Sequence, residues 1–135
     1  MKTATDPRHL GRRDAIKSLF AESFTKQSSH PDIVIKIKEQ EDKINKLIVH
    51  SAPTWPIEKI NKIDLAILHL AIYELLNEDT PPKVVIDEAV ELAKEFGSES
   101  SGSFVNGVLG TVFDNLDLNA KVKVEEIAEK YEQTL

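Results

Sequence analysis

The side chains best suited to chemistry in this sequence are the cations near its N-terminus. Residues 1–17 carry two lysines and three arginines against two carboxylates, whereas the whole chain has a formal net charge of −6. Lysine and arginine neutralise phosphate groups, so a basic end on an acidic chain indicates an anionic partner for one face of the protein. The adjacent Arg12 and Arg13 are the strongest candidates for such contacts.

The sequence offers little for catalysis or for metal binding. It has no cysteine, four scattered histidines, no glycine-rich phosphate loop and no nucleophile motif with its partners. Glu88, Glu91 and Glu95 recur along one stretch, but this spacing is typical of the acidic outer side of a helix. We therefore expect no catalytic residue, no metal site and no cofactor.

Length and hydropathy predict one soluble domain. A chain of 135 residues is large enough to bury its own core, and its N-terminus lacks the apolar segment of a signal peptide. The most apolar run, residues 63–76, is too short to span a bilayer and contains Asp64, His69 and Glu74. We expect a cytoplasmic protein with no membrane partner.

The elements that must position the cations are helical. Apolar residues recur at helical spacing between short polar breaks, and no stretch shows convincing strand alternation. The fold class is therefore all-α, a compact bundle of about six helices. We predict helices at about 12–26, 32–50, 57–77, 81–96, 100–116 and 119–135. The single domain, 1–135, divides into an N-terminal half (1–50) with the basic end, a C-terminal half (55–116) and an additional helix (119–135).

Three glycines are informative. Gly107 and Gly110 lie three residues apart within a predicted helix, where each costs about 1 kcal/mol relative to alanine. The spacing predicts a strip without side chains that lets another helix approach closely. Gly97 is expected to end its helix in a left-handed conformation. Trp55 and Tyr73 lie among aliphatic residues and are expected in the core.

Three blocks in this order resemble the NusB family of bacterial transcription antitermination factors. They are "DLAILHLAIYELL", "PPKVVIDEAVELAKEFG" and "SESSGSFVNGVLG", and the resemblance spans about residues 55–113. Trp55-Pro56 also fits, and "RHLGRRDAIKSLF" is similar to the family's arginine-rich first helix. The resemblance implies binding of boxA-type single-stranded RNA together with the small-subunit ribosomal protein NusE. It also implies assembly with RNA polymerase and other Nus factors during ribosomal RNA transcription.

The resemblance carries RNA-facing roles to nine positions of this chain. They are Arg8, Arg12, Arg13, Phe20, His69, Lys83, Ser100, Ser103 and Phe104. In these roles arginine neutralises phosphate and an aromatic side chain at a rim stacks on an unpaired base. From its residues alone, Phe104 fits a core position equally well, and His69 is more typical of the edge of a core.

The chain departs from the family pattern at several of these positions. Ser103 and His69 stand where the family commonly has cations, and Ser100 stands where it commonly has an acidic residue. Phe20 replaces a common tyrosine, and Gly110 replaces the usual aspartate. The absence of these cations leaves an alternative open: a helical protein-interaction module of the same fold with little RNA affinity. The NusB-like domain of some RNA methyltransferases is a third interpretation, which the lack of a cofactor-binding domain disfavours.

The segment before Trp55 is about one helix and loop shorter than the family pattern. Residues 119–135, in turn, form an extra amphipathic segment with Ile127, Tyr131 and Leu135. We expect this segment to pack where the missing helix would lie, so its deletion would lower the melting temperature.

Overall fold

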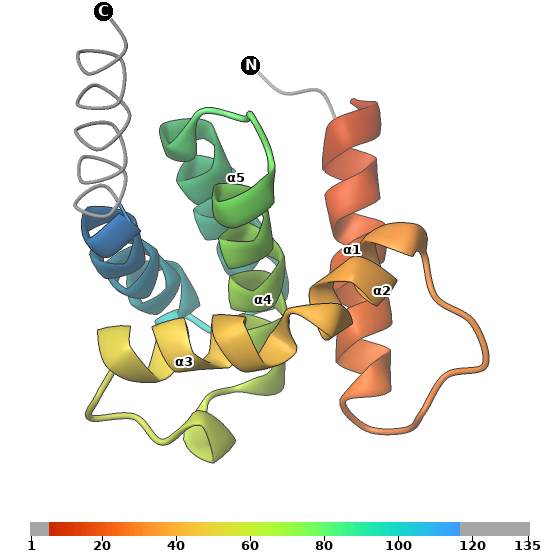
Figure 1. The fold of residues 1–135 in the computed structure, drawn as a ribbon, viewed down its shortest axis with the longest axis horizontal. Helices are drawn as coiled ribbons and strands as arrows, with labels where there is room; N and C mark the ends of the chain where they lie inside the picture. The colour runs from red at the N-terminus through yellow and green to blue at the C-terminus, as the bar shows by residue number, and fades with distance from the viewer. Residues whose placement is uncertain (1–5, 117–135) are drawn as a thin grey trace, which may run out of the picture.

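A computed structural model describes residues 6–116, which form an all-α fold with no strand in that range (Figure 1). The elements are α1 (Pro7–Glu22), α2 (Asp32–Glu39), α3 (Glu41–Ser51), a 3-10 turn η1 (Ile57–Lys59), α4 (Lys62–Asn77) and α5 (Pro82–Phe96). A sixth α-helix follows at residues 101–116. The predicted fold class is confirmed. The additional helix predicted at 119–135 lies outside the described residues.

Helix α4 is the centre of the fold. Ten of its residues are buried, because apolar side chains cover all of its sides, and it contacts α1, α2, α3 and α5. Leu68 and Ile72 are fully buried, and Tyr73 lies in the core as predicted. Asn61 begins the helix by accepting a hydrogen bond from the backbone N–H of Ile63. The predicted start at residue 57 is therefore early, since residues 57–59 form only the 3-10 turn.

The N-terminal half contains three helices where two were predicted. Helix α1 begins at Pro7 because Asp6 caps it, and it buries Ala15, Ile16 and Leu19. The helix predicted over 32–50 breaks at Gln40, whose N–H bonds to Ile37 three residues back.

The side chain of Gln40 explains why the break is held in place. The amides of Gln40 and Asn77 exchange two hydrogen bonds of 3.1 and 3.0 Å, which join the α2–α3 corner to the end of α4.

The glycine predictions are wrong, and the geometry explains why. A Cβ built on Gly107 or on Gly110 meets no atom within 4 Å, so no helix within residues 6–116 packs closely there. Gly97 has φ −94°, which is not left-handed. Its role is steric instead: a Cβ there would collide with the side chain of Ser101 and lie 2.7 Å from the carbonyl oxygen of Ala93.

Candidate nucleic-acid interface

Arg12 points into the protein rather than toward solvent. Its Nη2 lies 2.8 Å from Glu74 Oε1, its Nε lies 3.1 Å from both oxygens of Glu74, and its Nη1 lies 3.4 Å from Glu88 Oε1. Burial lowers the pKa of Arg12, but the hydrogen bond and charge of Glu74, together with the charges of Glu88 and Asp6, outweigh it, so the net shift is upward. The predicted phosphate contact is not supported, because two carboxylates already bind this guanidinium inside the fold.

The other cations predicted to meet RNA lie nearer the surface. Arg8 and Lys83 are exposed at the beginnings of α1 and α5. Arg13 is partly exposed; its guanidinium forms an ion pair with Glu95 and lies 4.9 Å from the centre of the Phe96 ring. An exposed ion pair of this kind is weak, so Arg13 can exchange Glu95 for another anion at little cost.

His69 is buried and uncharged at neutral pH. Its Nε2 lies 2.7 Å from Asn45 Oδ1, and only 8% of the residue is exposed. Burial, with a smaller contribution from the charge of Lys38, lowers the pKa of His69 to about 4. His69 therefore supplies no cation for RNA, and the core-edge position expected from its type is confirmed.

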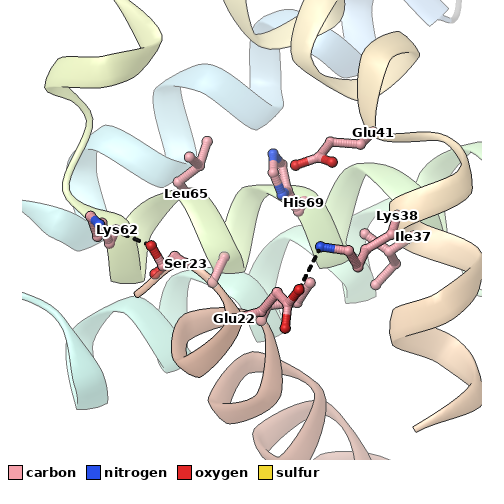
Figure 2. A pocket seen from close by; sticks show the side chains of 10 residues that line it. Glu22, Ser23, Ile37, Lys38, Glu41, Lys62, Leu65 and His69 are labelled. Atoms are coloured by element: carbon pink, nitrogen blue, oxygen red, sulfur yellow. Dashed lines mark hydrogen bonds and ion pairs between the residues drawn. The ribbon is translucent and has the colours of Figure 1, made fainter. Parts of the chain in front are cut away.

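His69 lines a cavity of about 140 Å³ between the end of α1, the α2–α3 corner and the beginning of α4 (Figure 2). Two lysines and two glutamates share this cavity, and Lys38 Nζ lies 3.3 Å from Glu22 Oε1. Lys62 Nζ donates to the backbone oxygen of Ser23 at 3.0 Å. Because the opposite charges balance, this cavity has no net attraction for a phosphate group.

Aromatic side chains gather instead around the N-terminal end of α4. Phe20, half-buried at the end of α1, packs edge-to-face against Phe24 with ring centres 4.9 Å apart. Phe24 is 62% exposed, and Lys62 Nζ lies 4.3 Å from the centre of its ring. The pair offers an exposed aromatic surface beside a positive charge.

A second aromatic pair lies across the same end of α4. The rings of Trp55 and Phe104 meet edge-to-face with centres 6.1 Å apart, and Trp55 is 53% exposed. The prediction of a core tryptophan is wrong because Trp55 lies on a Pro-flanked surface loop before η1. Both rings line a cavity of about 260 Å³, which we call the α4-end cavity. Its other lining residues are Lys59, Ile60, Asn61, Asp64, Ser98 and Ser100.

The predicted site residues are thus separated by the fold. Ser100 and Phe104 lie at the α4-end cavity, and Ser103 is exposed one residue before Phe104. Arg8 lies at the beginning of α1, whereas Phe20 lies near the end of that helix. Sequence reasoning missed Phe24, Trp55, Lys59 and Lys62. The run "TWPIEKINK" could have indicated three of them, since it places an aromatic residue and lysines in one turn-rich segment. Only the fold brings Phe24 to Lys62.

This end of the molecule can bind a flexible anionic chain with planar groups. Exposed rings supply stacking surfaces, and Lys59 and Lys62 supply positive charge beside them. Residues 6–116 contain no cluster of histidine and carboxylate side chains that could hold a metal ion. In the same range no helix has the length and apolar character needed to cross a bilayer.

Comparison with known proteins identifies the family. A model of the NusB family matches residues 12–114. The transcription antitermination protein NusB of Chloroflexus aggregans is 51% identical over 77 residues, which is 55% of this chain and 51% of that protein. The chain thus spans about half the length of the curated relatives it matches.

Solved structures agree with the family match. T. maritima NusB is 33% identical, with a TM-score of 0.71, and the similarity covers 83% of this chain and 92% of that one. A chain in the crystal structure of antitermination factors NusB and NusE in complex with dsRNA shares the fold at 21% identity, with a TM-score of 0.69 over 80% of this chain and 96% of the other. The chain described here belongs to the NusB family.

Proposed function

We propose that this protein is a non-enzymatic antitermination factor that binds boxA-type single-stranded RNA together with the ribosomal protein NusE. It would help assemble the antitermination complex on RNA polymerase, with other Nus factors, during ribosomal RNA transcription in the cytoplasm. The observation that carries the proposal is the pair of exposed aromatic surfaces with lysines at the N-terminal end of α4, in a chain of the NusB family. A related fold crystallised with NusE and dsRNA supports it.

Base stacking on the rings and attraction of phosphates to the lysines both contribute to the proposed RNA affinity. Base stacking on an aromatic side chain contributes about 1–3 kcal/mol per base, and it does not need a basic protein. Lys59 and Lys62 add phosphate attraction beside the rings, which offsets the absence of free cations at positions 69 and 103. Arg8, Arg13 and Lys83 extend the positive charge along α1 and α5.

Binding of labelled RNA across a salt series tests the proposal. We expect boxA-like RNA to bind more tightly than a scrambled RNA of the same composition, with and without the ribosomal protein. Replacing Lys59 and Lys62 with glutamine is expected to make the salt slope shallower by about 0.7 for each of the two lysines that neutralises a phosphate. Equal affinity for both RNAs would refute the proposal.

Aromatic substitutions separate stacking from charge. Trp55→Ala should weaken RNA binding by about tenfold, which corresponds to about 1.4 kcal/mol, and leave the salt slope unchanged. It should also alter stability little, since half of the ring is already exposed. Val49→Ala is the matched control, because Val49 is 51% exposed on α3, outside the aromatic surfaces. Equal RNA affinity in the two variants would show that Trp55 does not meet RNA.

The interaction module with little RNA affinity remains the second candidate. It is favoured by the ion-paired Arg12 and the neutral His69, which remove two of the cations that the family resemblance implied. In this case the ribosomal protein binds normally, while RNA binds weakly and without preference for boxA.

A further inference from the structure

Lys62 is a cation at a position where its own helix gains nothing from the charge. It is the first residue of α4, and because the positive end of the helix dipole lies at that terminus, a lysine there is mildly unfavourable. Its side chain extends toward the end of α1, where Nζ donates to the backbone oxygen of Ser23 at 3.0 Å (Figure 2). The same ammonium lies over the ring of Phe24. The contacts of Lys62 with this turn, and not the stability of α4, therefore explain its position.

The main chain around Phe24 is held by other hydrogen bonds besides that of Lys62. The backbone N–H of Phe24 donates to the carbonyl oxygen of Ala21 at 3.2 Å. Three residues further on, the backbone N–H of Gln27 donates to Glu22 Oε2 at 2.7 Å and ties the turn to the last residue of α1. Because these bonds already fix the backbone, the contribution left to Lys62 is the orientation of the Phe24 side chain.

The ring of Phe24 is held by two neighbours and still reaches solvent. Lys62 Nζ lies 4.3 Å from the ring centre, within the range of a cation–π contact, and the Phe20 ring meets it at an interplanar angle of 83°. The residue nevertheless keeps 62% of its surface exposed. An exposed ring without such contacts exchanges between rotamers, and immobilising it on binding weakens affinity by about two- to tenfold. A ring that is already held avoids much of this loss.

We propose that Lys62 is a positioning residue for RNA binding, whose ammonium holds the Phe24 ring in the orientation that stacks on an unpaired base. This inference rests on the proposed function, and it assigns Lys62 a role beyond the attraction of phosphates. A lysine that only attracts phosphates acts independently of Phe24. A lysine that positions the ring acts through Phe24, so most of its effect on RNA affinity is lost when the ring is removed.

A double-mutant cycle measures this dependence. Fluorescence anisotropy gives the Kd of labelled boxA-like RNA, in the presence of the ribosomal protein, for the native protein, Lys62→Gln, Phe24→Ala and the double variant. We expect Lys62→Gln to weaken binding about fivefold in the native protein but no more than about twofold in the Phe24→Ala variant. Lys59→Gln is the matched control, because it removes the same charge beside the other aromatic pair. Its effect should be equal in the two backgrounds.

Three further measurements distinguish positioning from a general structural role. Lys62→Gln should leave the melting temperature nearly unchanged, since it removes a cation from the N-terminus of α4. Lys62→Arg keeps a cation that can lie over the ring, so it should bind RNA within about twofold of the native protein. In NMR spectra recorded without RNA, the ring current of Phe24 should shift the ε-methylene protons of Lys62 upfield, and the shift should vanish in Phe24→Ala.

The outcomes separate the inference from the proposed function. If Lys62→Gln weakens binding equally in both backgrounds, Lys62 only attracts phosphates, and the inference is wrong although RNA binding stands. Tighter RNA binding by Lys62→Gln also overturns it, because the ammonium then covers the surface that a base needs. A large drop in the melting temperature of Lys62→Gln, or no upfield shift in the native protein, likewise contradicts it. If the native protein does not prefer boxA-like RNA to scrambled RNA, the proposed function fails and the inference with it.

Discussion

Acidification should destabilise this protein through His69. The imidazole is buried against Asn45, and burial lowers its pKa from 6.5 to about 4. Between these two values the unfolded chain binds a proton that the folded protein excludes. Stability therefore rises with pH in this window, is fully present above about pH 6.5, and is lost as the pH falls.

The size of the effect follows from the same two values. Each pKa unit corresponds to about 1.4 kcal/mol, so the His69 contribution falls by about 2 kcal/mol at about pH 5 and by about 3 kcal/mol at about pH 4. A loss of this size is a large part of the stability of a typical domain, about 5–15 kcal/mol.

Urea denaturation at about pH 7.5 and about pH 5, followed by far-UV circular dichroism, measures the loss. Carboxylates also contribute in this range, since a backbone hydrogen bond from Gln27 lowers the pKa of Glu22. The His69→Gln variant isolates the histidine, because the carboxylates are common to both proteins. We expect the native protein to lose about 2 kcal/mol more than His69→Gln does. Equal losses in the two proteins would refute a buried, neutral His69.

Two further predictions concern buried charge and glycine. Arg12→Ala should destabilise the fold by about 3–5 kcal/mol in urea denaturation, because it leaves Glu74 buried without its partner. Arg13→Ala should destabilise it by less than about 1 kcal/mol, because its ion pair is near the surface. Similar losses for both variants would contradict the burial of Arg12. Gly107→Ala should raise the free energy of unfolding by up to about 1 kcal/mol, and with it the melting temperature, since the new Cβ enters open space. Gly97→Ala should lower the melting temperature, because its Cβ would collide with Ser101. A destabilised Gly107→Ala variant would restore the close-packing interpretation.

Hydrophobic periodicity predicted the helices well where an apolar stripe runs without interruption. Helix α5 and residues 101–116 lie almost where the sequence placed them, and the all-round apolar pattern of α4 correctly indicated a central helix. The break at Gln40 was not predictable in the same way. No proline or glycine marks it, and its amide pairs with Asn77, 37 residues away in the sequence.

The candidate site was less predictable because residue type does not say which way a side chain points. Arg12 and Arg13 are neighbours, and therefore lie about 100° apart around α1. The fold turns Arg12 toward Glu74 in α4 and Arg13 toward Glu95 at the C-terminal end of α5. Charge counting treated them as one basic pair, although only Arg13 is near solvent. The family resemblance likewise assigns His69 to an RNA-facing position, but it does not say whether the imidazole is buried or charged.

The burial of Arg12 and His69 changes what the net charge of −6 means for RNA binding. With Arg12 neutralised by carboxylates and His69 uncharged, the cations left for phosphate lie at the protein's surface, among them Lys59 and Lys62 beside exposed rings. The loss of these two positions as phosphate contacts predicts a shallower salt dependence, and stacking, which salt screens little, then carries a larger share of the affinity.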